Sequence, residues 1–289
     1  MNAPADISSA PEETIANVEE WSGKDRGDEN FPVGSALISA RLRRHVHAFY
    51  VFARNADDIA DSPSLAPQDK ISRLDVMEAV LRGHRADGSP SATRLRASLA
   101  ETGVTPLHSL DLLIAFRRDA TKRRYASWDE LFDYCRYSAM PVGRHVLELH
   151  GEGRETWEPS DALCVALQVL NHLQDCVRDL AELDRCYLPL DLMAAYGASL
   201  EDLSRPSASP GLRRVIDVLL DHCDALNRAA PGLPRRTRNR RLRLETAVIV
   251  GLCRRLSARL RAADPVATRV KLTKMDAVAS LFAAVRYTP

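Results

Sequence analysis

Two pairs of aspartates constrain the fold more than any other feature of this 289-residue chain. Asp175 and Asp179 follow the apolar run 162–173, and Asp57 and Asp61 close an earlier apolar segment. If both segments are helices, the two residues of each pair lie on one face, with Cβ atoms roughly 5–6 Å apart. Two like charges at that spacing destabilise a helix unless a cation lies between them. The pairs therefore predict two helices that line a divalent-metal site.

The remaining chain also has the apolar periodicity of helices, with only 6% aromatic residues. Helices are expected over 33–61, 67–81, 92–101, 106–120, 127–150, 160–183, 191–196, 211–230, 235–262 and 274–286. Ser127 and Glu130 predict a capping box, and Pro141 predicts a kink in the helix that follows. No internal repeat or long linker divides the chain. The expected fold class is all-α, with a single domain over 28–289 after a disordered polar tail over 1–27.

The composition argues against several classes of protein. A net charge of +1 gives no support for nucleic-acid binding. The six cysteines are dispersed without a C-x-x-C pair, which is typical of reduced thiols in the cytoplasm. The longest apolar runs are well short of the ~20 residues that a membrane-spanning helix needs. A cytoplasmic protein is expected, and peripheral contact with the inner membrane stays open.

The surroundings of the aspartates favour a metal site over surface charge. An isolated pair at this spacing is more often a solvated helix face, but these two pairs share their register with apolar neighbours. Gln168 and Asn171 precede Asp175 and Asp179 on the same helical face and extend it into a polar stripe. Paired aspartates with no His or Cys at ligand spacing suit Mg²⁺, with Mn²⁺ as the alternative ion. His172 is off this stripe and is expected to be packed or solvent-facing.

Basic residues near the pairs predict a phosphate ligand. Arg54 lies one turn before Asp57, and Arg178 lies between the aspartates of the second pair. The guanidinium fork suits phosphate oxygens, and a bound Mg²⁺ leaves some of the oxygens of a diphosphate free. Further candidates are the basic connector 122–124, Arg269, Lys271 and Lys274. The arginine-rich run 235–243 is interpreted as a solvated helix face, with anionic lipid contact as the less favoured alternative.

Together these motifs resemble the squalene/phytoene synthase family, the head-to-head prenyl synthases. The resemblance extends from about residue 29 to 285 and rests on four segments in the same order. These carry Tyr50, Arg54, Asp57, Asp58 and Asp61; then Tyr134, Tyr137 and Gly143; then Gln168, Asn171, Asp175, Asp179 and the Tyr187 to Pro189 tripeptide; then Arg269 and Lys274. The family implies an isoprenoid-synthase-type helical bundle with a central apolar cavity.

Within the family the chain is most similar to the hydroxysqualene synthase branch of the bacterial hopanoid route. The opening segment 29–33 resembles that branch. Condensing members usually carry Arg and Glu where this chain has Gln174 and Arg178, and often Tyr where it has Leu252. The branch implies a carbon–oxygen lyase that ionises presqualene diphosphate, rearranges the carbocation and quenches it with water to give hydroxysqualene.

The resemblance also implies roles for individual residues. Asp57, Asp61, Asp175 and Asp179 would hold Mg²⁺, with Asp58 as a helper. Arg54, Arg178, Arg269 and Lys274 would bind the diphosphate. Tyr50 and Tyr137 would stabilise the carbocation, although a core aromatic is the plain alternative for each. Gln168 and Asn171 would position the quenching water. The C30 tails are expected along the helix kinked at Pro141.

Three other functions stay open at this point. The first is a condensing transferase that makes presqualene diphosphate, squalene or phytoene from prenyl diphosphates. The second is a catalytically silent assembly factor, which would be expected to lack the aspartates that this chain has. The third is a lipid-surface protein that uses the run 235–243. If the lyase reading holds, a presqualene diphosphate synthase and a hydroxysqualene reductase are its functional partners.

Overall fold

The computed structural model describes residues 17–19 and 38–287, and in this part the regular elements are all helical. The expected all-α fold class is confirmed. The α-helices are α1 Ala40–Asp61, α2 Pro67–Arg82, α3 Pro90–Thr102, α4 Leu107–Thr121, α5 Trp128–Ser138, α6 Met140–Leu149, α7 Trp157–Leu183, α8 Leu190–Ala195, α9 Pro210–Ala229, α10 Gly232–Arg236, α11 Arg240–Ala262 and α12 Lys274–Ala284. None of these helices is long and apolar enough to cross a membrane.

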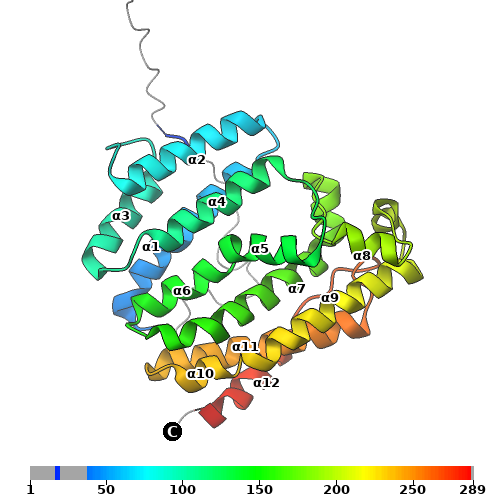
Figure 1. The fold of residues 1–289 in the computed structure, drawn as a ribbon. Coiled ribbons are helices and arrows are strands. Elements are labelled where there is room, and N and C mark those ends of the chain that lie inside the picture. Colours follow the sequence, from blue (N-terminus) through cyan, green and yellow to red (C-terminus); the bar gives the residue numbers. More distant parts are fainter. Residues whose placement is uncertain (1–16, 20–37, 288–289) are drawn as a thin grey trace, which may run out of the picture.

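The helices form layers around α7 (Figure 1). α1 to α4 pack together in the upper part of the view, and α9 to α12 lie below α5, α6 and α7. Each part has its own hydrophobic core. Phe52, Ile59, Leu74 and Met77 belong to the core of α1 to α4, and Leu170 belongs to the larger core around α7. Polar residues of α1, α4 and the end of α7 meet where these two parts join, and the aspartates lie there.

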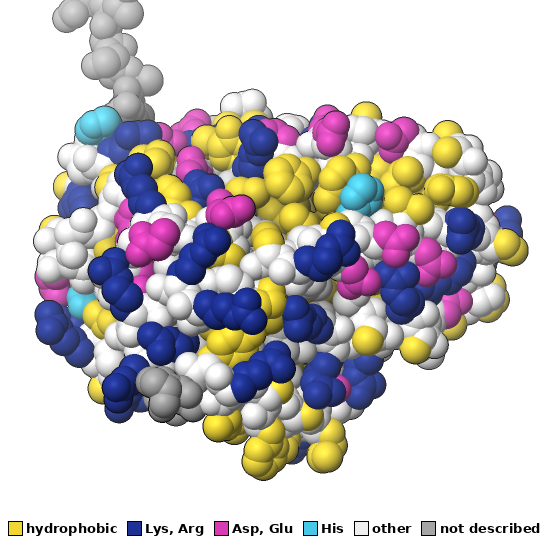
Figure 2. All heavy atoms as spheres, turned by 60° about the horizontal axis from the view of Figure 1, so that its bottom comes forward, with side chains coloured by type: hydrophobic (Ala, Val, Ile, Leu, Met, Phe, Trp, Pro, Cys, Tyr) yellow, Lys and Arg dark blue, Asp and Glu magenta, His cyan; other side chains and the backbone are white. Residues whose placement is uncertain are grey.

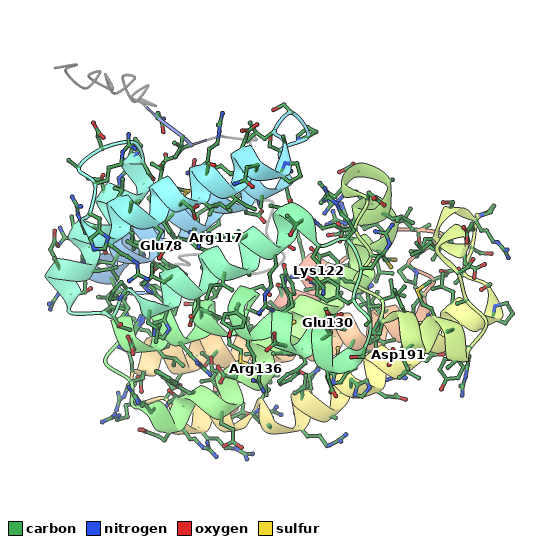
Figure 3. The ribbon with its side chains drawn as sticks, turned by 45° about the horizontal axis from the view of Figure 1, so that its top comes forward. Glu78, Arg117, Lys122, Glu130, Arg136 and Asp191 are labelled. Atoms are coloured by element: carbon green, nitrogen blue, oxygen red, sulfur yellow. The ribbon has the colours of Figure 1, made fainter. Side chains whose placement is uncertain are left out.

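Charged pairs fix the upper helices to one another. Arg117 reaches from α4 to Glu78 on α2, with Nη2 2.7 Å from the carboxylate, and the same guanidinium binds Asp75 at 2.6 Å (Figure 3). Glu78 also binds Arg82 one turn further along α2. These bonds hold α4 against α2 and so place the C-terminal end of α4, which contributes Asp119 to the candidate site.

The expected helix 127–150 is two helices. Ala139, with φ −121° and ψ −51°, separates α5 from α6, and Pro141 lies in the first turn of α6. A proline in that turn removes an N–H that has no helical acceptor, so the chain breaks cleanly instead of kinking. The expected capping box is half formed. Ser127 accepts from the Glu130 N–H at 3.3 Å, but the Glu130 carboxylate accepts from the Ala126 N–H and from Lys122 (Figure 3).

The expected helix 235–262 is also divided. α10 ends at Arg236, and Asn239 caps α11 by accepting from the N–H groups of Arg241 and Leu242 at 3.0 and 3.1 Å. The buried Glu152 accepts from the N–H groups of Arg238 and Asn239 at 2.8 and 2.7 Å. The break is stable because a carboxylate far away in the sequence satisfies both exposed backbone donors.

Two expectations lie largely outside the described residues. One is the family-like opening segment 29–33 with the expected helix start at 33, so α1 is described only from Ala40. The other is the polar tail. Of the tail 1–27, only residues 17–19 are described. Val18 is fully buried and donates its N–H to the Gly88 carbonyl at 2.9 Å, while Glu19 accepts from the Ser89 hydroxyl at 2.7 Å. This short segment therefore packs against the start of α3.

We predict that Glu152→Ala lowers the free energy of unfolding by about 2–3 kcal/mol, because two N–H groups lose a charged acceptor. Urea unfolding followed by circular dichroism measures the change. Glu155→Ala is the matched control, because Glu155 is exposed and its carboxylate makes only a 3.5 Å surface ion pair with Arg238. The control should change stability by less than about 0.5 kcal/mol. Equal effects of the two substitutions would contradict the role assigned to Glu152.

Candidate active site

The first aspartate pair lies in the last two turns of α1 and is organised by Arg54. Arg54 Nη2 lies 2.7 Å from Asp58 Oδ1, and its Nη1 lies 3.1 Å from Asp57 Oδ2. The Asp58 side chain is 3% exposed. The sequence suggested Asp58 as a helper ligand, and the geometry gives it a clear task, which is to hold the Arg54 guanidinium beside Asp57.

Asp57 has the electrostatics expected of a metal ligand. Its side chain is partly buried, with 34% of its surface accessible. Burial, together with the charge of Asp61, raises the pKa of Asp57 to about 8, against the opposing effect of Arg54. Asp61 itself is bound by Arg185, whose Nη1 lies 2.6 Å from Oδ1. A divalent cation would relieve this repulsion and favour the ionised form of both carboxylates.

The second pair lies in the last third of α7, where Asp175 is held by two arginines. Arg269 Nε lies 2.5 Å from Oδ1, and Arg178 Nη2 lies 2.9 Å from Oδ2. Both arginines are expected diphosphate ligands, and the structure brings both to the aspartate. Arg178 is 41% exposed and Arg269 is 37% exposed, whereas Asp175 is 12% exposed. The guanidiniums are therefore accessible from solvent and hold the carboxylate from outside.

Asp179 ends a polar chain that includes His172. His172 Nδ1 lies 4.0 Å from Asp179 Oδ2, and His172 Nε2 lies 3.2 Å from the Gln168 amide nitrogen. The His172 ring stacks on Tyr187, with centroids 3.5 Å apart. His172 is packed, as expected, but it also links Gln168 to Asp179. The sequence did not predict that link, because residue 172 lies beside the stripe and Tyr187 lies beyond the end of the helix.

The structure adds Asp119 and Arg185, which sequence reasoning missed. Asp119 on α4 accepts from the hydroxyls of Tyr134 at 2.8 Å and Tyr187 at 3.4 Å. Arg185 binds Asp61, and its Nη2 donates to the carbonyls of Ala60 at 3.1 Å and Asp119 at 2.9 Å. Arg185 thus ties the connector after α7 to α1 and α4. Neither residue has a local signal, since each stands among other charged residues in the sequence.

The other candidate residues are placed less decisively. Tyr50 and Asn171 are partly buried on α1 and α7. Tyr137 lies in the last turn of α5 with its ring face covered by the Arg118 guanidinium, 4.6 Å from the centroid. Lys274 is exposed at the first position of α12. The roles of these four residues and the central apolar cavity stay predictions.

The basic connector 122–124 has structural partners. Lys122 binds Glu130, Arg123 donates to the Leu183 carbonyl at 3.1 Å, and Arg124 binds the Asp184 carboxylate at 2.6 Å. These bonds fasten the α4–α5 connector to the end of α7. The connector thus supports the second aspartate pair, and its part in diphosphate binding stays a prediction.

Two positions that distinguish this chain from condensing members have different surroundings. The buried Gln174 donates its amide to the Val270 carbonyl at 2.6 Å and so fixes the segment that carries Arg269. Leu252 lies in a small buried cluster with Ala247, Val248 and Ala284, between α11 and α12. Gln174 therefore acts on the site through the position of Arg269, while Leu252 packs the helix that follows.

The residues present fit a divalent cation that is also bound by water and by substrate phosphate. In the described part of the chain, no group of three His, Cys, Asp or Glu side chains is placed to hold one ion. Each aspartate pair offers two carboxylates, and Mg²⁺ is commonly held by one or two carboxylates together with water and substrate phosphate. A cation shared by the neighbouring carboxylates of one pair would stabilise both in the ionised form.

Comparison with known proteins identifies the family. The family model described as squalene/phytoene synthase matches residues 24–276. The chain belongs to the squalene/phytoene synthase family. It is 47% identical to the hydroxysqualene synthase of Rhodopseudomonas palustris over 263 residues, which cover 91% of this chain and 90% of the relative. It is 44% identical to the hydroxysqualene synthase of Zymomonas mobilis, over 91% of this chain and 89% of the relative.

Solved structures agree with this assignment. The crystal structure of squalene synthase HpnC from Alicyclobacillus acidocaldarius is similar with a TM-score of 0.72 and 34% identity, covering 82% of this family member and 90% of that chain. A dehydrosqualene synthase has a TM-score of 0.76 at 21% identity, over 90% and 92% of the two chains, and supports the fold alone. The isoprenoid-synthase-type helical bundle expected from the motifs is confirmed.

Asp119 gives a pH-dependent prediction. Burial raises the pKa of Asp119 to about 7, despite Arg185 and the two tyrosine hydroxyls, which lower it. Between about pH 4 and 7 the folded carboxyl keeps a proton that the unfolded chain releases. The contribution of Asp119 to the free energy of unfolding should fall as pH rises through that window, by up to about 1.4 kcal/mol per pH unit. Asp119→Asn removes the titration, so its unfolding free energy should lose that slope relative to wild type.

Urea unfolding of wild type and Asp119→Asn at a series of pH values from 4.5 to about 7.5 tests this, with other titrating groups cancelling in the difference. Asp133→Asn is the control, because Asp133 is 47% exposed where it binds Arg118. Identical pH slopes for wild type and Asp119→Asn would show that Asp119 is already ionised in the folded protein.

Proposed function

We propose that this protein converts presqualene diphosphate into hydroxysqualene, as a carbon–oxygen lyase of squalene and hopanoid biosynthesis. The support is the 44–47% identity to hydroxysqualene synthases over about nine tenths of both chains. The observation that carries the proposal is the placement of Asp175 between Arg178 and Arg269. Carboxylates for a cation and guanidiniums for a phosphate thus share one site, as a metal-assisted diphosphate departure requires.

Diphosphate departure is the first chemical step. Mg²⁺, with Mn²⁺ as the alternative, would be held by Asp57, Asp61, Asp175 and Asp179 and would supply charge neutralisation for the leaving oxygens. Arg269 and Arg178 exchange the Asp175 carboxylate for phosphate oxygens, and Arg54 is already aimed at the first pair. The carbon–oxygen bond breaks with its electron pair on the diphosphate, so this step needs no general base.

The carbocation must then meet water at one carbon only. Tyr50 and Tyr137 are the candidates to offer ring faces to the cation, and Tyr137 could do so once the Arg118 guanidinium leaves its ring. Gln168 and Asn171 are the candidates to position the quenching water. The contact of Gln168 with His172, and of His172 with Tyr187, gives this part of α7 a fixed orientation. The proton of the added water passes to solvent or to the departing diphosphate.

Gln174 supports the lyase reading over condensation. Condensation of two prenyl diphosphates must manage two diphosphate groups, whereas presqualene diphosphate carries one. A neutral amide at 174 gives the site one cation fewer than an arginine would, and the Gln174 amide is used to hold the Val270 carbonyl. The runner-up is a condensing transferase that makes presqualene diphosphate, squalene or phytoene, and it would use the same aspartates. The aspartates also argue against a silent assembly factor.

In the proposed pathway, one enzyme supplies the substrate of this protein and another consumes its product. Its substrate requires a presqualene diphosphate synthase, and its product is a substrate for a hydroxysqualene reductase. Both substrate and product carry C30 chains that partition into bilayers. A cytoplasmic protein with peripheral contact to the inner membrane fits that substrate.

Purified protein supplied with presqualene diphosphate and Mg²⁺ should release diphosphate and form a C30 alcohol, identified by mass spectrometry. Asp57→Ala and Asp175→Ala should each reduce turnover by at least about 100-fold, and EDTA should abolish it. Glu182→Ala is the matched control, because Glu182 is exposed on α7 within two turns of Asp175. Unchanged turnover in both aspartate variants would refute the site. Consumption of farnesyl diphosphate alone would make the protein a condensing synthase.

A further inference from the structure

α12 presents its apolar side to solvent, the reverse of an ordinary packed helix. Met275 is 73% exposed and Phe282 is 74% exposed, and the other exposed apolar residues of this side are Val278, Leu281 and Val285. The side that packs on α11 carries Asp276, Ser280 and Ala284, two of which are polar. A contiguous exposed apolar patch of this kind marks an interaction surface.

The orientation of α12 is fixed by its contacts. Thr273 and Asp276 form a capping box, and Arg259 of α11 donates to the Asp276 carboxylate at 2.8 Å. Ser280 lies against Gly251, where even a Cβ atom would come within 2.9 Å of the Ser280 Cβ. Since small and polar groups interlock on the inner side, the apolar side is held outward.

A basic pocket adjoins the C-terminal end of α12. It has a volume of about 550 Å³ and is lined by Arg235, Arg243, Arg254, Arg286 and Tyr287, with two prolines. Within residues 17–19 and 38–287, none of these four arginines lies within 4.0 Å of a carboxylate oxygen. Arg243 and Arg254 are instead oriented by the backbone carbonyls of Thr237 and Asn227, at 2.9 and 3.4 Å.

The surface around α12 and the arginine pocket is also rich in basic and apolar side chains. Figure 2 shows Lys and Arg side chains gathered across it, with apolar side chains protruding at its lower edge. Lys271 and Lys274 are exposed beside the start of α12. An apolar strip with a basic border is the arrangement by which an interfacial helix binds anionic lipid.

We propose that the face formed by α10, α11 and α12 docks on an anionic bilayer, with the apolar side of α12 among the lipids and a phosphate headgroup in the arginine pocket. A second copy of this chain fits less well, because a self-complementary contact would bring the arginines of both copies together. A free phosphate would fill the pocket but leave Met275 and Phe282 exposed. The bilayer accounts for both observations.

The docking face continues into the candidate active site. Arg269, which binds Asp175, lies four residues before Thr273, the N-cap of α12. Docking would therefore place the diphosphate-binding segment near the headgroups. This last point rests on the proposed function, whereas the docking itself depends only on the surface.

Co-sedimentation of the full-length protein with vesicles tests the proposal. Vesicles of phosphatidylcholine with phosphatidylglycerol should bind the protein, and vesicles of phosphatidylcholine alone should bind far less. Raising the salt concentration should weaken binding. Phe282→Glu should reduce the partition coefficient by roughly tenfold or more. Arg243→Gln and Arg286→Gln should each reduce it on the order of fivefold.

Matched substitutions elsewhere are the controls. Leu107→Glu changes an apolar side chain that is 53% exposed on α4, and Arg136→Gln removes an exposed arginine of α5 (Figure 3). Both should bind vesicles like wild type. Turnover of presqualene diphosphate in detergent should be unchanged by Phe282→Glu, so loss of docking and failure of the proposed reaction are distinguishable.

Three outcomes would overturn the proposal. The first is equal binding to neutral and anionic vesicles. The second is wild-type binding by Phe282→Glu and by both arginine variants. The third is a dimer in solution, seen by light scattering, that Phe282→Glu dissociates while vesicle binding is absent, since α12 would then be covered by a second copy of this chain.

Discussion

Repulsion between carboxylates held side by side is the constraint on which the rest of the structure depends. Each aspartate pair brings two negative charges onto one helical face inside the protein, and the surrounding residues compensate for them. Arg54 and Arg185 compensate the pair on α1, and Arg178 and Arg269 compensate Asp175 on α7. The exposed guanidiniums of Arg178 and Arg269 can turn from Asp175 to a diphosphate while a metal takes their place at the carboxylate, so the total charge of the site changes little.

The same balance explains how the helices are joined. Arg185 connects the end of α7 to α1 and α4, because one buried guanidinium binds Asp61 and two backbone carbonyls. Gln174 connects α7 to the segment after α11 through Val270. The polar site is therefore also the seam between the two hydrophobic cores. Loss of one of these contacts would misalign the aspartates as well as lower the free energy of unfolding.

The sequence was sufficient for the fold class and for the residues with periodic signals. The aspartate pairs and Arg178 were predicted because helical spacing and charge identify them locally, whereas Arg269 was predicted from its charge and the family resemblance. Asp119 and Arg185 were missed, since only tertiary packing brings them to Asp61 and Tyr134. The divided helix after residue 232 was missed for the same reason: the break is satisfied by Glu152, some 80 residues earlier. Local patterns do not record such distant partners.

Binding of Mn²⁺ measured by electron paramagnetic resonance, with and without inorganic diphosphate, tests the central claim most directly. We expect weak binding of Mn²⁺ alone, because Arg178 and Arg269 already neutralise Asp175, and at least about tenfold tighter binding when diphosphate takes up those guanidiniums. Asp175→Asn and Asp57→Asn should remove the enhancement. Mn²⁺ affinity that is indifferent both to diphosphate and to these two substitutions would contradict the account.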